Sequence, residues 1–273
     1  MVRKKNSWKW TLIALIPMFF MLFPIYFIIV GSFETTTQIF HQPPYLFPPT
    51  PQLVNYSTAF KFLANNFLNS TLITIGVVIL VLVMAPIAAF ALAKLKIKLG
   101  KIFNYIFVLI IILPGSATII PIYLLFREFG LTNTLLGVMI AISSFEVSFI
   151  TIMLASYFQS FPVALIEAGE MDGASLSRIY WSIVLPLSKP ALATATIFAA
   201  LEGWNNFVLP LTLIQDNKLH PLSVGLFYFV GQWGTEWNYL LAGSVIYSLP
   251  AIIIILIGSK YLISGLTAGA FKE

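Results

Sequence analysis

The sequence predicts an all-α membrane protein that crosses the bilayer six times, and three observations support this fold class. Of the 273 residues, 59% are hydrophobic and only 9% are charged, whereas a soluble domain has roughly 25% charged residues. Apolar runs of the length that crosses a bilayer, about 20 residues, recur along the chain. The basic residues gather in short clusters between these runs. One soluble core could not bury so much apolar surface, and the bilayer is the solvent that matches this composition.

Six apolar runs are long enough to span the membrane as helices. Four of them carry no charge over about 20 residues and lie at 11–33, 71–93, 102–126 and 239–263, the last being uncharged as far as Ser259. Two more, at 135–158 and 191–214, each contain one acid, Glu146 and Glu202. The first run is longer than the roughly 7–15 residues of a signal-peptide core and lacks a cleavage motif after it, so we expect a retained helix.

The distribution of Lys and Arg predicts that both termini are cytoplasmic. If residues 1–10 lie inside, the inward-facing segments hold all but three of the 15 basic residues, the exceptions being Lys61, Arg127 and Lys218. Cytoplasmic segments of membrane proteins carry such an excess of positive charge. This orientation places the loop 159–189 and the tail 264–273 in the cytoplasm.

The loop 159–189 is the longest on the cytoplasmic side, and its pattern predicts a helix, a turn and a second helix. Pro162 suits the first turn of a helix, where its missing N–H costs nothing. Gly173 allows a tight turn. A second short helix is expected to begin near Ser175, and Pro186 helps to end it before the fifth span.

The first helix of this loop has an apolar face and an acidic flank. Leu165 and Gly169 share one face at helical spacing, while Glu167 and Glu170 lie beside it and are followed by Asp172. Acids fit poorly against the anionic cytoplasmic leaflet. The pattern therefore favours docking into a groove on a soluble protein partner over an ordinary loop held against lipid.

The same loop resembles the signature loop of binding-protein-dependent ABC importer permeases, which reads Glu-Ala-Ala, three residues, Gly, nine residues, Ile, one residue, Leu-Pro. This chain has Gly169 at the position of the second Ala, a change that should weaken the helix by about 1 kcal/mol or less. The positions that match the pattern in register are Glu167, Ala168, Gly173, Ile183, Leu185 and Pro186.

Similar stretches cover nearly the whole chain and resemble the maltose-type sugar permeases, in particular the shorter, second subunit of their permease pair. Among them are Trp204-Asn205 with Leu209-Pro210-Leu211, and the tail 265–270. The resemblance implies the type I permease fold of ABC importers, in a multi-pass protein of the cell membrane. It also implies three protein partners, namely a related second permease, a dimeric cytoplasmic ATPase and an external solute-binding protein. The implied cargo is a carbohydrate.

In that family the signature loop forms a coupling helix that is seated in a cleft of the ATPase. The resemblance implies that Glu167 pairs with a basic residue of the ATPase, that Gly173 makes the sharp turn, and that Leu185-Pro186 anchor the return to the fifth span. The remaining residues of this implied coupling element are Ala168, Gly169, Asp172 and Ile183.

The sequence contains no recognisable catalytic constellation. It has no Cys, which excludes disulfides and thiol chemistry. It also lacks a Gly-x-x-x-x-Gly-Lys-Ser/Thr motif, so ATP and Mg²⁺ are expected on the partner ATPase and no cofactor on this chain. Its two histidines, His41 and His220, lie in external loops near prolines, and we expect both to be solvated. The net charge of +5 is divided among short loops, which disfavours nucleic-acid binding.

Two acids are expected near the middle of the membrane, where an ionised carboxylate is costly unless it is paired or hydrated. Glu202 would share a helical face with Asn205 and Asn206, and such a polar stripe suits sugar hydroxyls or the lining of a wet cavity. The candidates for a translocation path are Glu146, Glu202, Trp204, Asn205 and Asn206. The alternative is that the acids are protonated, or paired with the second permease, in a packing role.

An intramembrane pair of acids also suits a proton-coupled secondary transporter. Such transporters usually have internal repeats with broken helices in matching halves, and the sequence has no convincing repeat. We therefore expect the permease of an ATP-driven importer and keep the proton-coupled transporter as the alternative.

Overall fold

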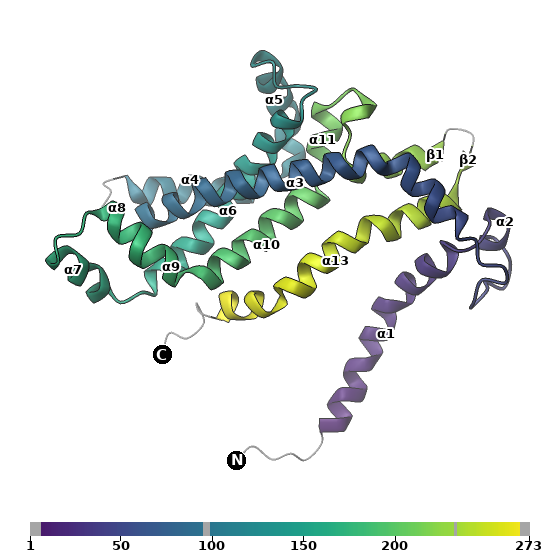
Figure 1. Cartoon of the computed structure of the whole chain (residues 1–273), viewed down its shortest axis with the longest axis horizontal. Helices are drawn as coiled ribbons and strands as arrows, with labels where there is room; N and C mark the ends of the chain where they lie inside the picture. Colours follow the sequence, from purple (N-terminus) through teal and green to yellow (C-terminus); the bar gives the residue numbers. More distant parts are fainter. Residues whose placement is uncertain (1–6, 95–98, 232–233, 268–273) are drawn as a thin grey trace. The chain divides into compact units, whose positions relative to one another are not determined.

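The computed structural model describes residues 7–94, 99–231 and 234–267 (Figure 1). In this part of the chain the regular structure is helical apart from one antiparallel hairpin, formed by β1 (Val230–Gly231) and β2 (Gly234–Thr235). The predicted all-α class is therefore confirmed. Of the segments expected in the cytoplasm, 1–6, 95–98 and 268–273 lie outside the described residues.

The chain divides into two compact units, which are described separately. The first comprises 1–64 and 226–249, and the second comprises 65–225 and 250–273. Two long helices contribute to both, α3 (Val54–Lys94) and α13 (Trp237–Thr267). The first unit also contains α1 (Ser7–Gly31), α2 (Thr36–Ile39), the 3-10 turn η3 (Leu226–Phe229) and the β-hairpin.

Asn55, in the first turn of α3, ties the first unit together. Its Nδ2 donates hydrogen bonds to the carbonyl oxygens of Ser32, at 3.0 Å, and Glu34, at 2.9 Å. Its Oδ1 accepts a hydrogen bond from Nδ2 of Asn238 in α13 at 3.1 Å. One buried amide thus supplies hydrogen bonds to two backbone carbonyl groups of the segment that leaves α1. It also joins this segment to the starts of α3 and α13. Helix α1 itself exposes most of its apolar side chains, among them Phe20 and Met21, as suits a bilayer environment.

The second unit is built around α6 (Leu135–Gln159), which lies beside α4 and α10 (Figure 1). Helix α3 buries a stripe of side chains that recur every four residues, at Ile73, Val77, Val81, Ala85 and Ala89. The other helices of this unit before the loop 159–189 are α4 (Gly100–Ile112) and α5 (Gly115–Glu128). Those of the loop are α7 (Val163–Met171), α8 (Leu176–Ile179), the π-helical turn η1 (Tyr180–Val184) and α9 (Leu185–Leu187). Those that follow are α10 (Lys189–Asn205), α11 (Val208–Leu213), the 3-10 turn η2 (Asn217–Leu219) and α12 (Leu222–Gly225).

Two helices expected to be continuous are broken. The helix expected over 102–126 ends at Ile112 and resumes as α5, whose axis differs by 106°. The reason is local: Pro114 has no N–H, and a residue before proline avoids the helical region, so Leu113 is extended with ψ 126°. The helix expected over 191–214 ends at Asn205, because Asn206 is extended with ψ 125° before α11 begins.

The segment between the first two expected spans, 11–33 and 71–93, is also less of a loop than those bounds imply. Helix α3 begins at Val54, just after the last proline of this segment, Pro51. Its 41 residues give an axis of about 60 Å, twice the roughly 30 Å of a bilayer core, so α3 continues well beyond the expected span 71–93. Four helices of the described residues are long and apolar enough to cross a membrane. Two helix pairs are bent at a short break, 100–112 with 115–128 and 176–187 with 189–205, and they raise the number to six if each pair is one span.

Helices α3 and α10 approach closely at Gly203, which predicts a strong effect of a single methyl group. An added Cβ would lie 2.9 Å from Cα of Thr74 and 3.3 Å from Cβ of Val77. Overpacking of this kind costs about 1–3 kcal/mol. We expect Gly203→Ala to lower the thermal unfolding midpoint of the purified protein, as measured by scanning fluorimetry in detergent.

The matched control is Gly115→Ala, because a Cβ at Gly115 would meet nothing within 4 Å. Alanine has the higher helix propensity by roughly 1 kcal/mol, so this midpoint should stay unchanged or rise slightly. Equal midpoints for the two variants would contradict the close approach of α3 and α10.

Candidate functional site

Two helix breaks of the second unit, at Leu113 and at Asn206, meet at one cavity. It has a volume of about 320 Å³ and lies between the start of α5, the middle of α6 and the turn from α10 to α11. Its lining residues are Gly115, Ser116, Thr118, Ile119, Ile142, Phe145, Glu202, Asn206, Val208 and Leu209. The cavity therefore combines mostly apolar walls with a few polar groups, the usual character of a small-molecule site.

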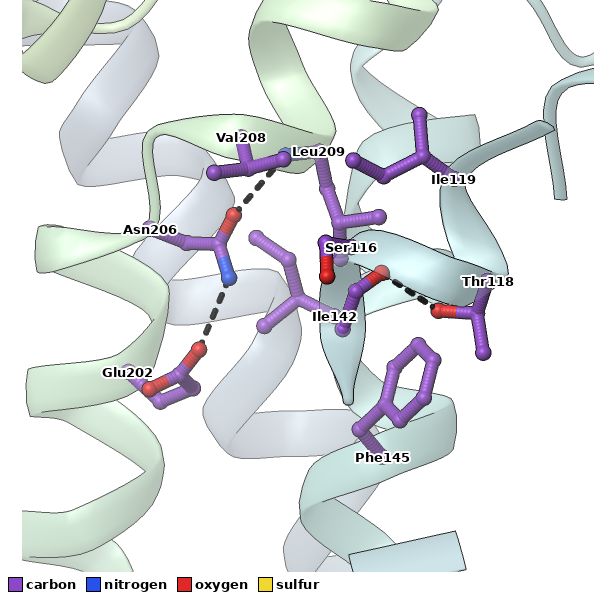
Figure 2. A pocket seen from close by; sticks show the side chains of 10 residues that line it. Ser116, Thr118, Ile119, Ile142, Phe145, Glu202, Asn206, Val208 and Leu209 are labelled. Carbon is purple, nitrogen blue, oxygen red and sulfur yellow. Dashed lines mark hydrogen bonds between the residues drawn. The ribbon is translucent and has the colours of Figure 1, made fainter. Parts of the chain in front are cut away.

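Asn206 organises the polar side of the cavity (Figure 2). Its Oδ1 accepts a hydrogen bond from the backbone N–H of Leu209 at 3.2 Å, and its Nδ2 donates one to Oε1 of Glu202 at 2.7 Å. The bond to a backbone N–H identifies the amide oxygen, so the amide nitrogen must face the carboxylate. The break in the helix and the position of the Glu202 carboxylate are thus linked through one side chain.

Neutral polar groups lie across the cavity from this pair (Figure 2). Ser116 and Thr118 come from the first turn of α5, and Oγ1 of Thr118 donates to the carbonyl oxygen of Gly115 at 2.8 Å. Ile142 and Phe145 of α6 form the wall between them and Glu202. The cavity can therefore offer a carboxylate and hydroxyl groups to a ligand that also has an apolar surface.

The structure brings only some of the predicted path residues to this cavity. Glu202 and Asn206 line it, whereas Trp204 is buried with its ring edge-on to Phe67 of α3, at 5.4 Å between ring centroids. Asn205 is exposed and is not among the lining residues. Glu146 is half-buried on α6, near enough to Glu202 for the two charges to interact. That these five residues line a translocation path stays a prediction.

Sequence reasoning missed the contribution of α5 to the cavity. The signal was present in Pro114-Gly115, a helix-breaking pair inside an apolar run and followed by Ser116 and Thr118. Broken helices mark binding sites in many transporters. The run was long enough to be interpreted as one straight span, and so the break was overlooked.

The loop 159–189 has the predicted helix–turn–helix form. Helix α7 ends in a Schellman motif, in which Ala174 N–H donates to the carbonyl oxygen of Gly169 at 2.9 Å and Gly173 N–H to that of Glu170 at 3.0 Å. Gly173 has φ +74°, a conformation that glycine adopts without strain. The side chain of Ser175 caps α8 by accepting a hydrogen bond from Arg178 N–H at 3.3 Å.

Close packing holds the two helices of this loop together. A Cβ on Gly169 would lie 3.2 Å from Cγ1 of Ile179 and 3.3 Å from Cδ1 of Ile183, so the small residue allows α7 to approach α8 and η1. Nζ of Lys94, at the end of α3, donates to the carbonyl oxygen of Phe161 at 3.1 Å, which ties the start of the loop to the helical core. The loop is therefore a rigid extension of the second unit.

The outward face of α7 mixes acids with apolar side chains. Glu167, Glu170 and Asp172 are exposed. Met171 is 88% exposed between two of these acids, and Leu165 is 42% exposed. By contrast, Ile183 and Leu185 are half-buried against the core. The exposed set forms a surface that suits a protein partner.

A ladder of amides on α3 holds the segment 214–222 of the second unit. Nδ2 of Asn69 donates to the carbonyl oxygens of Lys218, at 2.8 Å, and His220, at 3.1 Å, and Nδ2 of Asn66 donates to the latter at 2.9 Å. The backbone N–H of Leu222 donates to Oγ of Ser70 at 2.8 Å. Polar residues of one helix thus replace backbone pairing for this segment.

This ladder corrects the expectation that both histidines are solvated. His41 is exposed, as predicted, and stacks on Tyr45 at 4.3 Å. His220, however, is only 6% exposed, and its Nε2 lies 3.1 Å from the carbonyl oxygen of Ile214. The backbone on either side of His220 is drawn against α3, which buries the ring.

The sequence matches a family model described as the inner membrane component of binding-protein-dependent transport systems, over residues 83–262. The chain belongs to this family of ABC transporter permeases. Membership confirms the predicted family, the multi-pass membrane location and the role as a permease. The family is a membrane component of transport systems, and nothing in the similarities supports a proton-coupled transporter.

Three relatives match almost end to end. The arabinooligosaccharide transport permease AraQ of Halalkalibacterium halodurans is 30% identical, with 97% of this chain and 96% of that protein covered. The melibiose/raffinose/stachyose import permease MelC of Bacillus subtilis is 29% identical, with 99% and 98% covered. The sulfoquinovosyl glycerol transport permease SmoH of Agrobacterium fabrum is 30% identical, with 92% and 89% covered.

The fold is that of known ABC importer permeases. A chain in the crystal structure of a bacterial ABC transporter that imports the acidic polysaccharide alginate superposes with a TM-score of 0.81, at 23% identity, covering 96% of this chain and 99% of that one. A chain of the MetNI methionine ABC transporter superposes with a TM-score of 0.63, at 16% identity, covering 76% and 98%. The predicted permease fold is confirmed, while the number of spans is six only if each bent pair counts as one.

The amide ladder predicts that Asn69→Leu will loosen the segment 214–222. Leucine has a similar branched shape but cannot donate, so the variant loses the two hydrogen bonds to the carbonyl oxygens of Lys218 and His220, each worth about 0.5–1.5 kcal/mol. We expect faster hydrogen exchange at the backbone amides of 214–222, measured by mass spectrometry on the purified protein.

A suitable control is Asn104→Leu, which makes the same chemical change at an exposed position of α4. Its exchange pattern in 214–222 should match that of the unmodified protein. If Asn69→Leu left the exchange of this segment unchanged as well, the ladder would not be what holds it.

Proposed function

We propose that this chain forms one half of the translocation path of an ATP-driven carbohydrate importer, paired with a second, related permease. Family membership supports the transport role, and the relatives support the class of cargo. Two of them are named for oligosaccharides and one for a glycosyl glycerol. The common chemistry of these cargoes is a glycosidic compound with many hydroxyl groups, so sugars, oligosaccharides and glycosides are the class proposed here.

The proposed assembly needs three further proteins. A second permease would complete the path, a solute-binding protein would deliver the cargo from outside, and a dimeric ATPase in the cytoplasm would supply the energy. ATP and Mg²⁺ would be bound by that ATPase, since this chain lacks the phosphate-binding Gly-x-x-x-x-Gly-Lys-Ser/Thr motif.

The rigid α7–turn–α8 element is the observation that carries the coupling part of the proposal. The Schellman motif at Gly173 and the contact between Gly169 and Ile179 fix its shape. The exposed acid Glu167 and the exposed Met171 lie on its outer surface. Movement of a docked ATPase would therefore be transmitted as movement of a rigid body to the helices that follow, rather than lost in a flexible loop.

Glu167 would pair with a basic group of the ATPase, and Leu185-Pro186 would lead the chain back into the membrane. The cavity at the helix breaks would then form part of the path, with Glu202 and Asn206 presenting hydrogen-bonding groups to the sugar. Trp204, Asn205 and Glu146 remain candidates for the same path. The ring of Trp204 against Phe67 would serve to hold α10 on α3.

The coupling role is tested by reversing the charge of Glu167. In proteoliposomes that contain the whole complex, Glu167→Lys should reduce ATP-dependent sugar uptake at least about tenfold, because a charge pair at a protein interface becomes a repulsion. The variant should still insert and purify, since Glu167 is exposed. Uptake and ATP hydrolysis are measured on the same vesicles.

The control for this experiment is Glu128→Lys, the same reversal at an exposed position at the end of α5, where uptake should stay within about twofold of the unmodified complex. Wild-type uptake by Glu167→Lys vesicles would rule out the coupling assignment.

The proposed orientation, with cytoplasmic termini, can be tested by labelling. The natural sequence has no Cys, so single cysteines report cleanly. In intact cells a membrane-impermeant thiol reagent should label Ser57→Cys, in the segment expected outside, and should reach Ser177→Cys only after the cells are opened. Both serines are exposed. Labelling in the reverse order would overturn the orientation.

A further inference from the structure

We infer that Glu202 makes the cavity selective by charge, so that this permease favours neutral and cationic carbohydrates over anionic ones. The inference rests on the proposed function and adds a preference within the proposed class of cargo. It follows from how the carboxylate is held, from the other groups that line the cavity, and from the positions of the nearest basic residues.

The carboxylate is held in place rather than free to turn away. Asn206 is fixed by the backbone N–H of Leu209, and its amide nitrogen then holds Oε1 of Glu202 at 2.7 Å. Glu202 is half-buried and lines the cavity (Figure 2). Its second oxygen is left to accept hydrogen bonds from a ligand, and a carboxylate accepts strongly from hydroxyl or ammonium groups.

The other lining groups do not offset this charge. Ser116 and Thr118 are neutral, and the remaining lining residues among those described are apolar or glycine apart from Asn206. Glu146 of α6 interacts electrostatically with Glu202 but is not among the lining residues, and it brings no positive charge to the cavity.

The basic residues on the helices that form the walls lie at the far ends of those helices. Lys189 begins α10, thirteen positions before Glu202, and Arg127 lies nine positions after Thr118 in α5. At about 1.5 Å per residue these separations are roughly 20 and 14 Å. Both side chains are also exposed. A cavity with apolar walls and one sign of charge concentrates ligands of the opposite sign by tenfold or more, on the order of magnitude found for charged clefts.

The charge of the cavity can be measured without any sugar. In the assembled complex, Ser116→Cys introduces a thiol into the cavity, and it is the single cysteine of this chain. Partner subunits without cysteines keep the signal specific to this thiol. Its reaction rates with a cationic (trimethylammonium) and an anionic (sulfonate) methanethiosulfonate reagent are compared. We expect the cationic reagent to be favoured, and the ratio of the two rates to fall about tenfold when Glu202→Gln is added.

The control for this measurement, and for the transport measurement that follows, is Glu128→Gln. It makes the identical change at an exposed acid outside the cavity and should leave the ratio of the two rates unchanged. An unchanged ratio of the two rates in Glu202→Gln would overturn the inference. The same result is expected if a basic group of the second permease neutralises Glu202, and it overturns the inference in that case too. Failure of both reagents to react would show that water does not reach the cavity, and would overturn it too.

Transport then tests the consequence for cargo. Uptake of a neutral oligosaccharide is compared with that of its uronic acid derivative, and the ratio for Glu202→Gln is divided by the ratio for wild type, so that the preference of the binding protein cancels. We expect the relative uptake of the uronic acid to rise about tenfold. If wild-type vesicles take up no carbohydrate with ATP, the proposed function fails, whereas uptake with an unchanged ratio overturns only the charge selectivity.

Discussion

A backbone N–H or C=O group without a hydrogen-bond partner is costly inside a bilayer, and this constraint controls where the helices of the second unit can break. At the end of α10 the break is supported by Asn206, whose side chain receives Leu209 N–H while its own N–H bonds to the carbonyl oxygen of Glu202 at 3.0 Å. At the end of α4 the break falls at Pro114, which has no N–H to satisfy. Each break occurs at a residue whose own chemistry limits the number of unsatisfied backbone groups and so the free-energy cost of the break.

The cavity is a consequence of these two breaks. Straight helices would pack along their full length and leave little space, whereas α5 turns by 106° from α4 and α11 starts a new direction after Asn206. The polar groups that support the breaks then become the polar groups of the cavity. In this way the requirement for satisfied backbone groups and the presence of a hydrophilic site have the same origin.

The loop 159–189 depends on a different physical property, which is the small size of glycine. Gly173 adopts φ +74° at the turn, and Gly169 brings α7 close to Ile179. The departure from the family pattern at Gly169 is therefore compatible with tight packing, because even a single methyl group there would press on Ile179 and Ile183. A rigid loop is what a device for transmitting motion requires.

The sequence by itself determined the fold class, the family and the shape of the loop 159–189, because hydrophobic runs and glycine or proline positions act over short distances along the chain. The break at Leu113 has a local signal in Pro114-Gly115, but the angle of 106° between α4 and α5 does not follow from it, and the break at Asn206 has no adjacent proline or glycine to mark it. Nor could the sequence show that Trp204 would turn toward Phe67 while Glu202 and Asn206 face Ser116 and Thr118. Those outcomes depend on which helices meet, and residues from α5, α6 and α10 are brought together only by packing in three dimensions.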